Sequence, residues 1–479
     1  MIYAPVTLPF RTRRLPGGRL LAVSDTGDHV FLKEDDLERL RIAPAELPIE
    51  QQARLKARFF LRSAGELPGL NRLLVSRRAA RRETVSQGPT LHIVVPTLWC
   101  GHSCRYCQVS RALDDSGHAL SQMDLDHVTN RIFESPSRTL TIEYQGGDPL
   151  LRFDLLRYSI EQLVERNQSE QRNLRFVIAS TLHQLTPEMC TFLKQHGVYL
   201  STSIDGPAAL HNKNRPTPTR DAHERTVRGI ELARSCLGPD SVSALMTTTK
   251  ASLQEPEAIV DEYVRHGFHD IFLRPLSAYG FAKRNQALLG YSLADFQTFY
   301  QRAIERVLYW NRQGYALREV YASVVLNKIL SPFDGGYVDL QSPTGAGSAV
   351  VVYNYDGFIY PSDEARMLAE TGDTSLRLGR IEEPLEKALS SPARQRLIDC
   401  SLTEGSKACG RCTYNLFCAP NPVDAQAQFG RPDVAAELTE HCRKHLWLFD
   451  AFFDRLCDAD DHQLDLFHRW AAPAGFAEA

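Results

Sequence analysis

Residues 91–107, LHIVVPTLWCGHSCRYC, join a strand-like apolar run to a loop that holds three cysteines. The run LHIVVPT has the continuous apolar character of a strand buried on both faces. Cys100, Cys104 and Cys107 follow it within eight residues. Closed zinc and iron–sulfur sites commonly use four protein ligands, so three thiolates leave one metal position for another ligand. The stretch predicts an open metal site at the end of a buried strand.

The same strand–helix alternation continues after this stretch. Further strand-like runs are TLTIEYQ, LRFVIAST, VYLSTSID, VSALMTTT and DIFLRPLS, and helical runs such as FDLLRYSIEQLVERN and EPEAIVDEYVRHGF lie between them. Thr186 and Pro187 suit a helix start, and Gly197 suits a helix end. Alternating units predict an α/β fold with a parallel sheet, and six units favour a partial (β/α)6 barrel over a closed one. The cysteine loop then lies at the carboxyl ends of the strands, where such folds bind ligands.

Composition excludes several classes of protein. The chain has 479 residues, 43% hydrophobic and 24% charged, with a net charge of -3. This balance provides no basic field for nucleic acid and no polybasic patch for a membrane surface. No apolar run approaches the ~18 residues of a spanning helix, and the N-terminus lacks the regions of a signal peptide. The eleven cysteines are odd in number and bunched, unlike a secreted disulfide framework. A cytoplasmic protein with metal or redox chemistry is expected.

The chain is expected to contain five segments. Residues 1–85 form a small α+β domain, with strands RLLAV and HVFL, a helix at KEDDLERL, and an exposed linker or helix end at SRRAARRET. Residues 86–290 form the partial barrel, and residues 291–340 form a helical bridge. Residues 341–446 contain a β-hairpin that turns at Asp356 and Gly357, followed by a second cysteine group. Residues 447–479 form a C-terminal helix and tail.

The spacing C-x3-C-x2-C after the first strand of a βα repeat, with Tyr106 before the last cysteine, resembles the radical S-adenosylmethionine enzymes. The resemblance implies that Cys100, Cys104 and Cys107 hold a [4Fe–4S] cluster. In that family S-adenosylmethionine chelates the open iron and yields a 5′-deoxyadenosyl radical that takes a hydrogen atom from the substrate. A zinc site is the alternative, but no second cysteine pair follows nearby, and Cys190 lies in an apolar helical run typical of a core.

The same resemblance assigns cofactor contacts to successive strand ends. YQGGDPL resembles the family's Gly-Gly-Glu-Pro motif, with aspartate in place of glutamate. Its glycines would let the backbone approach the methionine part of the cofactor, and its acid would pair with the ammonium group. The residues implied as S-adenosylmethionine contacts are Tyr106, Gly146, Gly147, Asp148, Ser180, Thr181, Ser203, Asp205 and Arg215. Each of them alone is also compatible with an ordinary turn or buried cap.

The second cysteine group comprises Cys409, Cys412, Cys418 and Cys442, enough to close a metal site. A zinc knuckle is one interpretation. The region also resembles the SPASM extension of peptide-modifying radical enzymes, which carries seven cysteines and two auxiliary clusters. Three of the seven positions hold Thr344, Ser362 and Pro422, and these belong together to the first auxiliary cluster. The resemblance therefore implies one auxiliary [4Fe–4S] cluster on the four cysteines. Cys400 is either a core residue or a replacement ligand.

Asp363 follows one of the substituted positions. In related sulfatase-maturing enzymes an aspartate at this place takes a proton from the substrate, which makes Asp363 a candidate catalytic residue. The competing interpretation is an aspartate that caps its own backbone at the end of a hairpin. Sequence alone does not separate these two roles.

Nearly the whole chain resembles the radical maturases of His-Xaa-Ser repeat peptide systems, on LPFRTRRLPGGRLLAVSDTGDHVFL, PTLWCGHSCRYCQVSR and TGAGSAVVVYNYDGFIYPSDEARM. The resemblance implies a ribosomal precursor peptide, a second radical maturase, and an electron donor such as flavodoxin or ferredoxin, with no nucleic-acid or membrane partner. The N-terminal domain would bind the peptide leader along an exposed strand edge.

The expected reaction is oxidative crosslinking or a related oxidation of peptide side chains. After hydrogen abstraction such a reaction must still remove one electron, and an auxiliary cluster can accept it. The alternatives are a peptide epimerase or thioether-forming enzyme, a radical enzyme acting on a small metabolite, and a non-catalytic iron–sulfur electron carrier.

Overall fold

The computed structural model describes residues 4–63, 66–277 and 279–472. Contacts divide the chain into two compact units. The first, here called the terminal unit, comprises residues 1–86, 322–345 and 398–479. The second, the barrel unit, comprises residues 87–321 and 346–397. The predicted segment 341–446 therefore contributes to both units.

A nine-stranded sheet forms the centre of the barrel unit, in the order β12-β10-β9-β8-β7-β6-β14-β15-β16. Its strands are β6 (Leu91–Thr97), β7 (Thr139–Gly146), β8 (Asn173–Ala179), β9 (Tyr199–Ser203), β10 (Val242–Thr247), β12 (Leu273–Arg274), β14 (Val350–Tyr353), β15 (Phe358–Tyr360) and β16 (Gly379–Arg380). Every neighbouring pair from β12 to β14 is parallel. The predicted partial barrel of six strand–helix units is confirmed.

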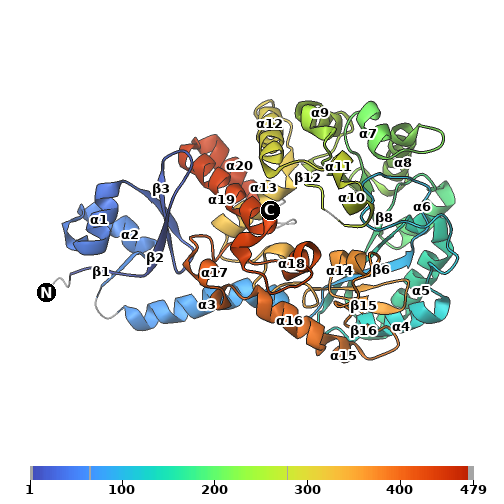
Figure 1. The fold of residues 1–479 in the computed structure, drawn as a ribbon, viewed down its shortest axis with the longest axis horizontal. Helices are drawn as coiled ribbons and strands as arrows, with labels where there is room; N and C mark the ends of the chain where they lie inside the picture. Colours follow the sequence, from blue (N-terminus) through green and yellow to red (C-terminus); the bar gives the residue numbers. More distant parts are fainter. Residues whose placement is uncertain (1–3, 64–65, 278, 473–479) are drawn as a thin grey trace. The chain divides into compact units, whose positions relative to one another are not determined.

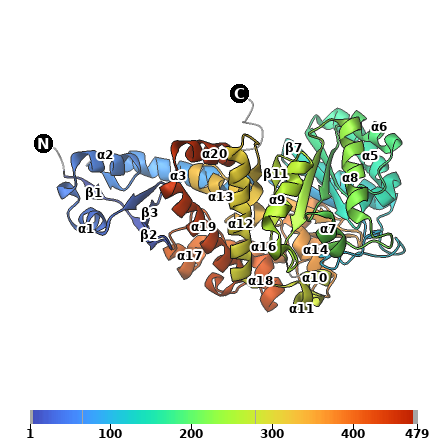
Figure 2. The same ribbon diagram turned by 90° about the horizontal axis from the view of Figure 1, so that it is seen from above.

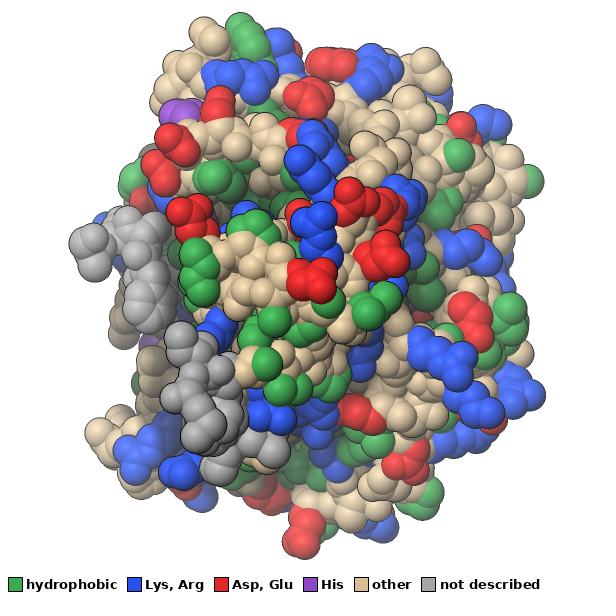
Figure 3. Space-filling view, turned by 90° about the vertical axis from the view of Figure 1, so that its left-hand side faces the viewer, with side chains coloured by type: hydrophobic (Ala, Val, Ile, Leu, Met, Phe, Trp, Pro, Cys, Tyr) green, Lys and Arg blue, Asp and Glu red, His purple; other side chains and the backbone are tan. Residues whose placement is uncertain are grey.

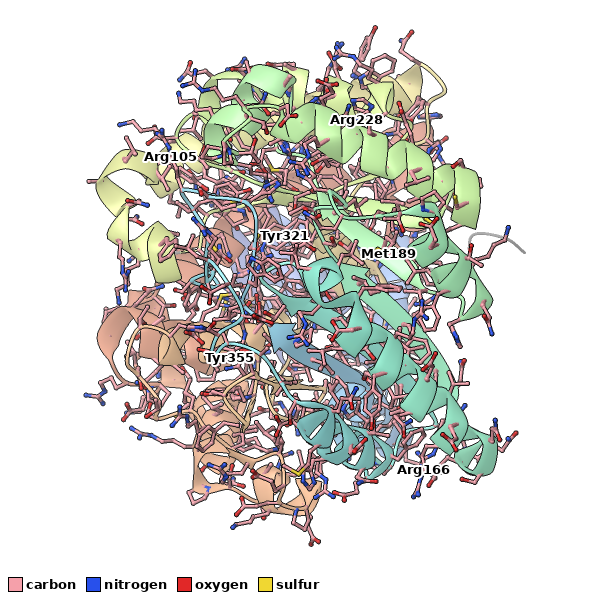
Figure 4. All side chains as sticks on the ribbon, turned by 90° about the vertical axis from the view of Figure 1, so that its right-hand side faces the viewer. Arg105, Arg166, Met189, Arg228, Tyr321 and Tyr355 are labelled. Atoms are coloured by element: carbon pink, nitrogen blue, oxygen red, sulfur yellow. The ribbon has the colours of Figure 1, made fainter. Side chains whose placement is uncertain are left out.

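Amphipathic helices cover the outer face of this sheet (Figure 1). They include α4 (Gln122–Phe133), α5 (Phe153–Glu170), α6 (Pro187–Gln195), α8 (Ala222–Leu237) and α9 (Pro256–Arg265). In Figure 4 the labelled Arg166, Met189 and Arg228 mark α5, α6 and α8 on this outer layer. The expected start of α6 is present, because the Thr186 side chain accepts a hydrogen bond from the Met189 backbone N–H.

Alternation along β7 decides which face of the sheet is polar. Leu140, Ile142 and Tyr144 are fully buried beneath the helices. Glu143 and Gln145 point to the opposite face, because successive strand side chains alternate. The interior of the barrel thus receives polar side chains from a strand whose other face is core.

The predicted hairpin is present as β14 and β15, and Gly357 in its turn has a φ of +78°. The hairpin was expected to lie in a C-terminal region separate from the barrel, but it lies in the barrel sheet. Strand β14 pairs in parallel with β6, with Val350 opposite Leu91 and Tyr353 opposite Val94. The hairpin therefore extends the barrel sheet beyond its first strand.

A long helix follows the last barrel strand. This is α12 (Leu293–Arg312), whose N-terminus is closed by a capping box between Ser292 and Asp295. It runs beside α9 in the barrel unit (Figure 2). The Arg306 guanidinium donates to both carboxylate oxygens of Asp261 at 2.7 and 2.9 Å, which joins the two helices.

The terminal unit contains an antiparallel sheet of β2 (Phe10–Arg14), β3 (Leu20–Ser24) and β4 (His29–Leu32). Its helices are α1 (Glu34–Ile42), α2 (Ile49–Ala57), α3 (Leu67–Ser86), α13 (Val320–Leu330), α17 (Lys407–Arg411), α18 (Pro422–Phe429), α19 (Glu440–Asp458) and α20 (Asp461–Ala471). Ala22, Val30, Leu40, Leu55 and Phe60 form a small core between the sheet and its helices. In Figure 3 acidic, basic and apolar side chains are interspersed over the face that is drawn.

The stretch SRRAARRET, predicted as an exposed linker or helix end, forms the C-terminal part of a helix. It lies within the 20-residue helix α3. Arg81 in this helix donates to the Leu416 carbonyl at 2.7 Å and lies over the Phe417 ring. An arginine-rich run becomes part of the packing because guanidinium groups can bind carbonyls and stack on aromatic rings. Across the described helices, none is both long and apolar enough to span a lipid bilayer.

Candidate functional site

The three N-terminal cysteines lie on one loop that follows β6 and lines a cavity of about 230 Å³ in the barrel unit. The loop is held by backbone bonds, including Cys107 N–H to the Cys104 carbonyl at 3.2 Å. The His102 backbone N–H donates to Cys100 Sγ at 3.4 Å, a contact that favours a thiolate. Burial raises the pKa of the Cys104 thiol to about 12.

The glycine pair at the end of β7 lines the same cavity. A Cβ on Gly147 would lie 2.2 Å from the Trp99 carbonyl oxygen, and one on Gly146 would lie 2.3 Å from the Thr97 carbonyl oxygen. Gly147 N–H donates to the Thr97 carbonyl at 2.9 Å. The glycines are thus required for close contact with the cysteine loop, a reason that the motif by itself did not indicate.

Asp148 is only 1% exposed and supports the edge of the cavity. Its carboxylate accepts hydrogen bonds from Ser180 Oγ at 2.6 Å and from Thr181 Oγ1. Burial raises the pKa of Asp148, and these two hydroxyl groups act against that rise. Ser180 and Thr181 themselves line the cavity. A direct contact between Asp148 and a cofactor stays a prediction.

Asp205 occupies the centre of a second polar group at the end of β9, and its side chain is fully buried. Tyr106 Oη donates to both of its oxygens at 2.9 and 2.8 Å, and Arg215 donates to them at 3.1 and 3.3 Å. Burial alone would lower the pKa of Arg215, but the Asp205 charge raises it overall. Tyr106, Ser203 and Arg215 line the cavity. Arg215 is therefore a fixed cation, suited to a carboxylate ligand.

Asp363 also lines the cavity, although it comes from a segment far along the chain. It begins α14 (Asp363–Ala369), directly after the N-cap Ser362. The Arg366 guanidinium donates to Asp363 Oδ1 at 2.9 and 2.6 Å, and Arg366 is fully buried. The helix is capped by Ser362, whose Oγ accepts from the Ala365 N–H, so the cap is not supplied by Asp363. Arg366 thus holds Asp363 through Oδ1 at the wall of the cavity.

The cavity is also lined by several side chains that were not predicted from the sequence. They are His102, Gln108, Gln145, Thr202, Thr226, Thr247, Arg274 and Met367. Thr247 and Arg274 end barrel strands, so the rule that selected Ser203 could have found them. Gln145 and Met367 carried no such signal, since one lies inside a strand and the other in a helix after the hairpin.

The four C-terminal cysteines gather within the terminal unit. Cys409 lies in α17 and Cys412 directly follows it, Cys418 lies in the next loop, and Cys442 lies in the first turn of α19. Burial raises the pKa of Cys418, and the charges of Cys412, Cys442 and Cys409 raise it further. The Tyr414 N–H donates to Cys412 Sγ at 3.4 Å, as the His102 N–H does to Cys100. Cys400 lies in α16 (Pro392–Ser401).

A zinc site requires its cysteine sulfurs to lie close together. A tetrahedral zinc site with Zn–S bonds of about 2.3 Å brings its sulfurs to about 3.8 Å from one another. Within the described residues, no three cysteine sulfurs lie within 4.8 Å of one another. The thiols are therefore not preformed as a tetrahedral zinc site.

The three substituted SPASM positions have structural roles here. The Thr344 N–H donates to Ser401 Oγ at 2.8 Å. Ser362 caps α14, and Pro422 is the first residue of α18, where a missing N–H costs nothing. Each residue thus suits its local backbone without a metal ligand at that position.

Comparisons with known proteins relate part of this chain to one superfamily. Residues 94–263 match the model of the Radical SAM superfamily. An AdoMet-dependent heme synthase of Methanosarcina barkeri is 28% identical over 355 residues, which are 70% of this chain and 91% of that protein. The chain spans 47% and 64% of the lengths of two other curated relatives, whose names give no activity.

Solved structures share the fold. Native anSMEcpe with bound AdoMet and a Kp18Cys peptide aligns with a TM-score of 0.65 at 17% identity, over 77% of this chain and 99% of that one. Streptococcus suis SuiB bound to its precursor peptide SuiA aligns with a TM-score of 0.56 at 12% identity, over 92% of this chain and all of that one. Cys100, Cys104 and Cys107 lie within residues 94–263, the part of the chain that matches the Radical SAM superfamily model, and that superfamily implies S-adenosylmethionine and a [4Fe–4S] cluster.

Proposed function

We propose that this chain, whose residues 94–263 match the radical SAM superfamily, oxidises side chains of a ribosomally made peptide, with crosslinking as the favoured outcome. The observation that carries the proposal is the single cavity that brings the three-cysteine loop, the strand-end polar residues and Asp363 together. A radical source and a proton acceptor then face the same substrate position.

The residues of the cavity have distinct proposed roles. Cys100, Cys104 and Cys107 hold the cluster, Arg215 binds the cofactor carboxylate, and Ser180 and Thr181 contact the cofactor from β8. When bound, S-adenosylmethionine and the cluster supply a 5′-deoxyadenosyl radical that removes a hydrogen atom. Asp363, oriented by Arg366, accepts the proton that the substrate loses during oxidation.

An auxiliary [4Fe–4S] cluster on Cys409, Cys412, Cys418 and Cys442 would serve as the electron acceptor. Joining two C–H or X–H groups releases two protons and two electrons. One proton and one electron leave as the abstracted hydrogen atom. Asp363 would take the second proton, and a cluster held by the four cysteines would supply the acceptor for the second electron. The grouping of these four cysteines within the terminal unit supports a cluster at this place.

Two observations support a peptide substrate over a small molecule. Both anSMEcpe and SuiB, which share the fold, were solved with peptides bound. The terminal unit also has a three-stranded sheet in which β4 is an end strand, with one edge unpaired within that sheet. We propose that a peptide leader adds to this edge, since strand addition is a common mode of peptide recognition.

A second candidate function is favoured by one finding. The relative from Methanosarcina barkeri is named a heme synthase and matches along 70% of this chain. A radical enzyme acting on a tetrapyrrole would use the same three-cysteine loop. It would have no need of an extended strand edge for its substrate.

Coexpression with short peptides encoded beside the gene tests the proposal. Mass spectrometry is expected to find a loss of two mass units per modified site, and reduced enzyme with S-adenosylmethionine is expected to yield 5′-deoxyadenosine. A Cys104→Ser variant should give neither product and should lose about half of about eight iron atoms. A Cys457→Ser variant, outside both cysteine groups, should behave like the wild type. Turnover of a tetrapyrrole without any peptide product would instead support the second candidate.

A further inference from the structure

A cluster of two histidines and one glutamate lies outside the cavity, between α8 and α9 of the barrel unit. Glu262 and His266 are four residues apart, so they lie one helical turn apart on the same face. His223, the second residue of α8, faces them. His223 Nε2 and His266 Nε2 lie 2.8 and 3.0 Å from the same oxygen of Glu262, Oε1.

The donor atoms have the geometry of metal ligands. All three lie within 4.8 Å of one another. Zinc bonds of about 2.0–2.2 Å to nitrogen and oxygen place tetrahedral ligand atoms about 3.4 Å apart, so the observed 2.8 and 3.0 Å require shifts of only a few tenths of an ångström. Two histidines and a glutamate leave a fourth corner for water.

The charge balance also favours a cation. The Glu262 side chain is 1% exposed, and a carboxylate this buried needs compensation. Arg265 pairs with the other oxygen, Oε2, but its side chain is 68% exposed and its charge is shared with solvent. Oε1 has two imidazole groups as its partners.

We propose that His223, Glu262 and His266 bind one divalent transition-metal ion of the zinc class. Imidazole donors favour zinc, nickel, copper or cobalt over magnesium and calcium. None of the three residues lines the cofactor cavity. The ion would therefore join α8 to α9 rather than take part in the radical reaction. The labelled Arg228 of Figure 4 lies on the same helix as His223.

The site would also stabilise the polar group behind the cofactor. The His223 ring lies 5.5 Å from the His211 ring. His211 Nδ1 accepts a hydrogen bond from the Asp205 N–H at 3.3 Å. A metal that fixes His223 would limit the movement of His211 and, through it, of Asp205.

Zinc retention by the cluster-loaded protein tests the proposal. The wild type, a His223→Ala/His266→Ala double variant and a His462→Ala/His468→Ala control are dialysed against zinc buffered by a chelator. His462 and His468 are exposed on α20, so their loss tests general histidine binding. Elemental analysis should find about one more zinc per chain in the wild type and the control than in the double variant, with equal iron.

Equal zinc in all three proteins, or no zinc retained by the wild type, would overturn the proposal. Because the double variant loses two packed rings, a Glu262→Gln variant gives a second measurement with the shape preserved. The wild type should gain thermal stability with zinc but not with magnesium, and the glutamine variant should not. A glutamine variant that gains as much as the wild type would also overturn it.

Discussion

Asp205 shows how a residue can support a site without facing it. Sequence analysis placed it among the S-adenosylmethionine contacts, but the structure buries it completely and leaves Tyr106 and Arg215 to line the cavity. Its carboxylate accepts from both of these side chains. Whether the cofactor reaches Asp205 itself stays a prediction, while its role in orienting Arg215 follows from the hydrogen bonds.

An Asp205→Asn substitution should therefore weaken both folding and cofactor binding. It removes the counter-charge of the buried Arg215, a loss of about 3–5 kcal/mol in unfolding free energy. Chemical denaturation and equilibrium binding of S-adenosylmethionine measure the two effects. A Glu224→Gln variant removes a carboxylate from the exposed Arg228–Glu224 pair and should change neither. Unchanged stability of Asp205→Asn would contradict the role assigned to Asp205.

At the scale of elements, two cysteines of the second group lie at helix starts. Cys442 lies in the first turn of α19, and its N–H donates to Thr439 Oγ1 at 3.1 Å. Cys409 is held in the same way by Ser406 at 3.3 Å. Sequence analysis selected these cysteines by their spacing, but the caps that orient them became visible only with the helix boundaries.

A Thr439→Ala variant should lose about 1 kcal/mol of stability and release iron faster from the proposed auxiliary site. Ser292→Ala removes a similar cap at α12, so it should lose similar stability without faster iron release. Iron release to a chelator and thermal unfolding give the two readouts. Equal iron release from both variants would argue against a link between the α19 cap and the cluster.

A second effect at this scale concerns the pairing of β6 with β14. His92 on β6 is fully buried, and its Nδ1 lies 3.1 Å from the Tyr353 hydroxyl on β14. Burial lowers the pKa of His92 from 6.5 to about 4. The folded state holds the neutral ring of His92, whereas the unfolded state takes up a proton below pH 6.5. The folded state therefore keeps its full stability above pH 6.5 and loses stability as the pH falls from 6.5 toward 4.

When the pH is lowered from 7 to 5.5, the unfolding free energy of the wild type should fall by about 1 kcal/mol more than that of a His92→Gln variant. The variant itself is expected to be less stable at pH 7, so the slope and not the absolute value is compared. Denaturation curves at the two pH values measure it. Parallel slopes for the two proteins would show that His92 titrates alike in the folded and unfolded states.

At the scale of the whole molecule, the barrel sheet is completed by a late segment. Strand β14 covers the edge of β6, and Val350, Val351 and Val352 are at most 3% exposed. An uncovered β6 would present an apolar sheet edge, which promotes aggregation. The barrel strands before α13 thus need β14, which comes after α13 in the chain.

Two fragments test this requirement. Residues 87–397 retain every strand of the barrel sheet, whereas residues 87–345 lack β14, β15 and β16. The longer fragment should elute as a monomer from size-exclusion chromatography after refolding, and the shorter one should aggregate. Equal monomer yields would mean that β6 needs no partner on that edge.

Much of this molecule could be predicted from local pattern. The six strand–helix units, the capped start of α6, the hairpin turn and the helix α12 follow from periodicity and from turn residues, which act over a few positions. The gathering of Gln145, Thr226 and Met367 around the cavity could not be predicted, because no local pattern brings those positions together. The same holds for α3, where Arg81 packs against the Leu416 carbonyl and the Phe417 ring, more than 300 positions away in the chain.

The sequence by itself determined the chemistry: three cysteines on a strand-end loop, four more in a second group, and polar residues at successive strand ends. Those features depend on residue type and spacing, which the chain states directly. Only the tertiary structure decided that Asp205 and Asp148 support the cavity from behind, that Asp363 reaches it, and that β14 joins β6. These outcomes depend on contacts between distant segments, which burial of apolar surface and pairing of backbone groups select together.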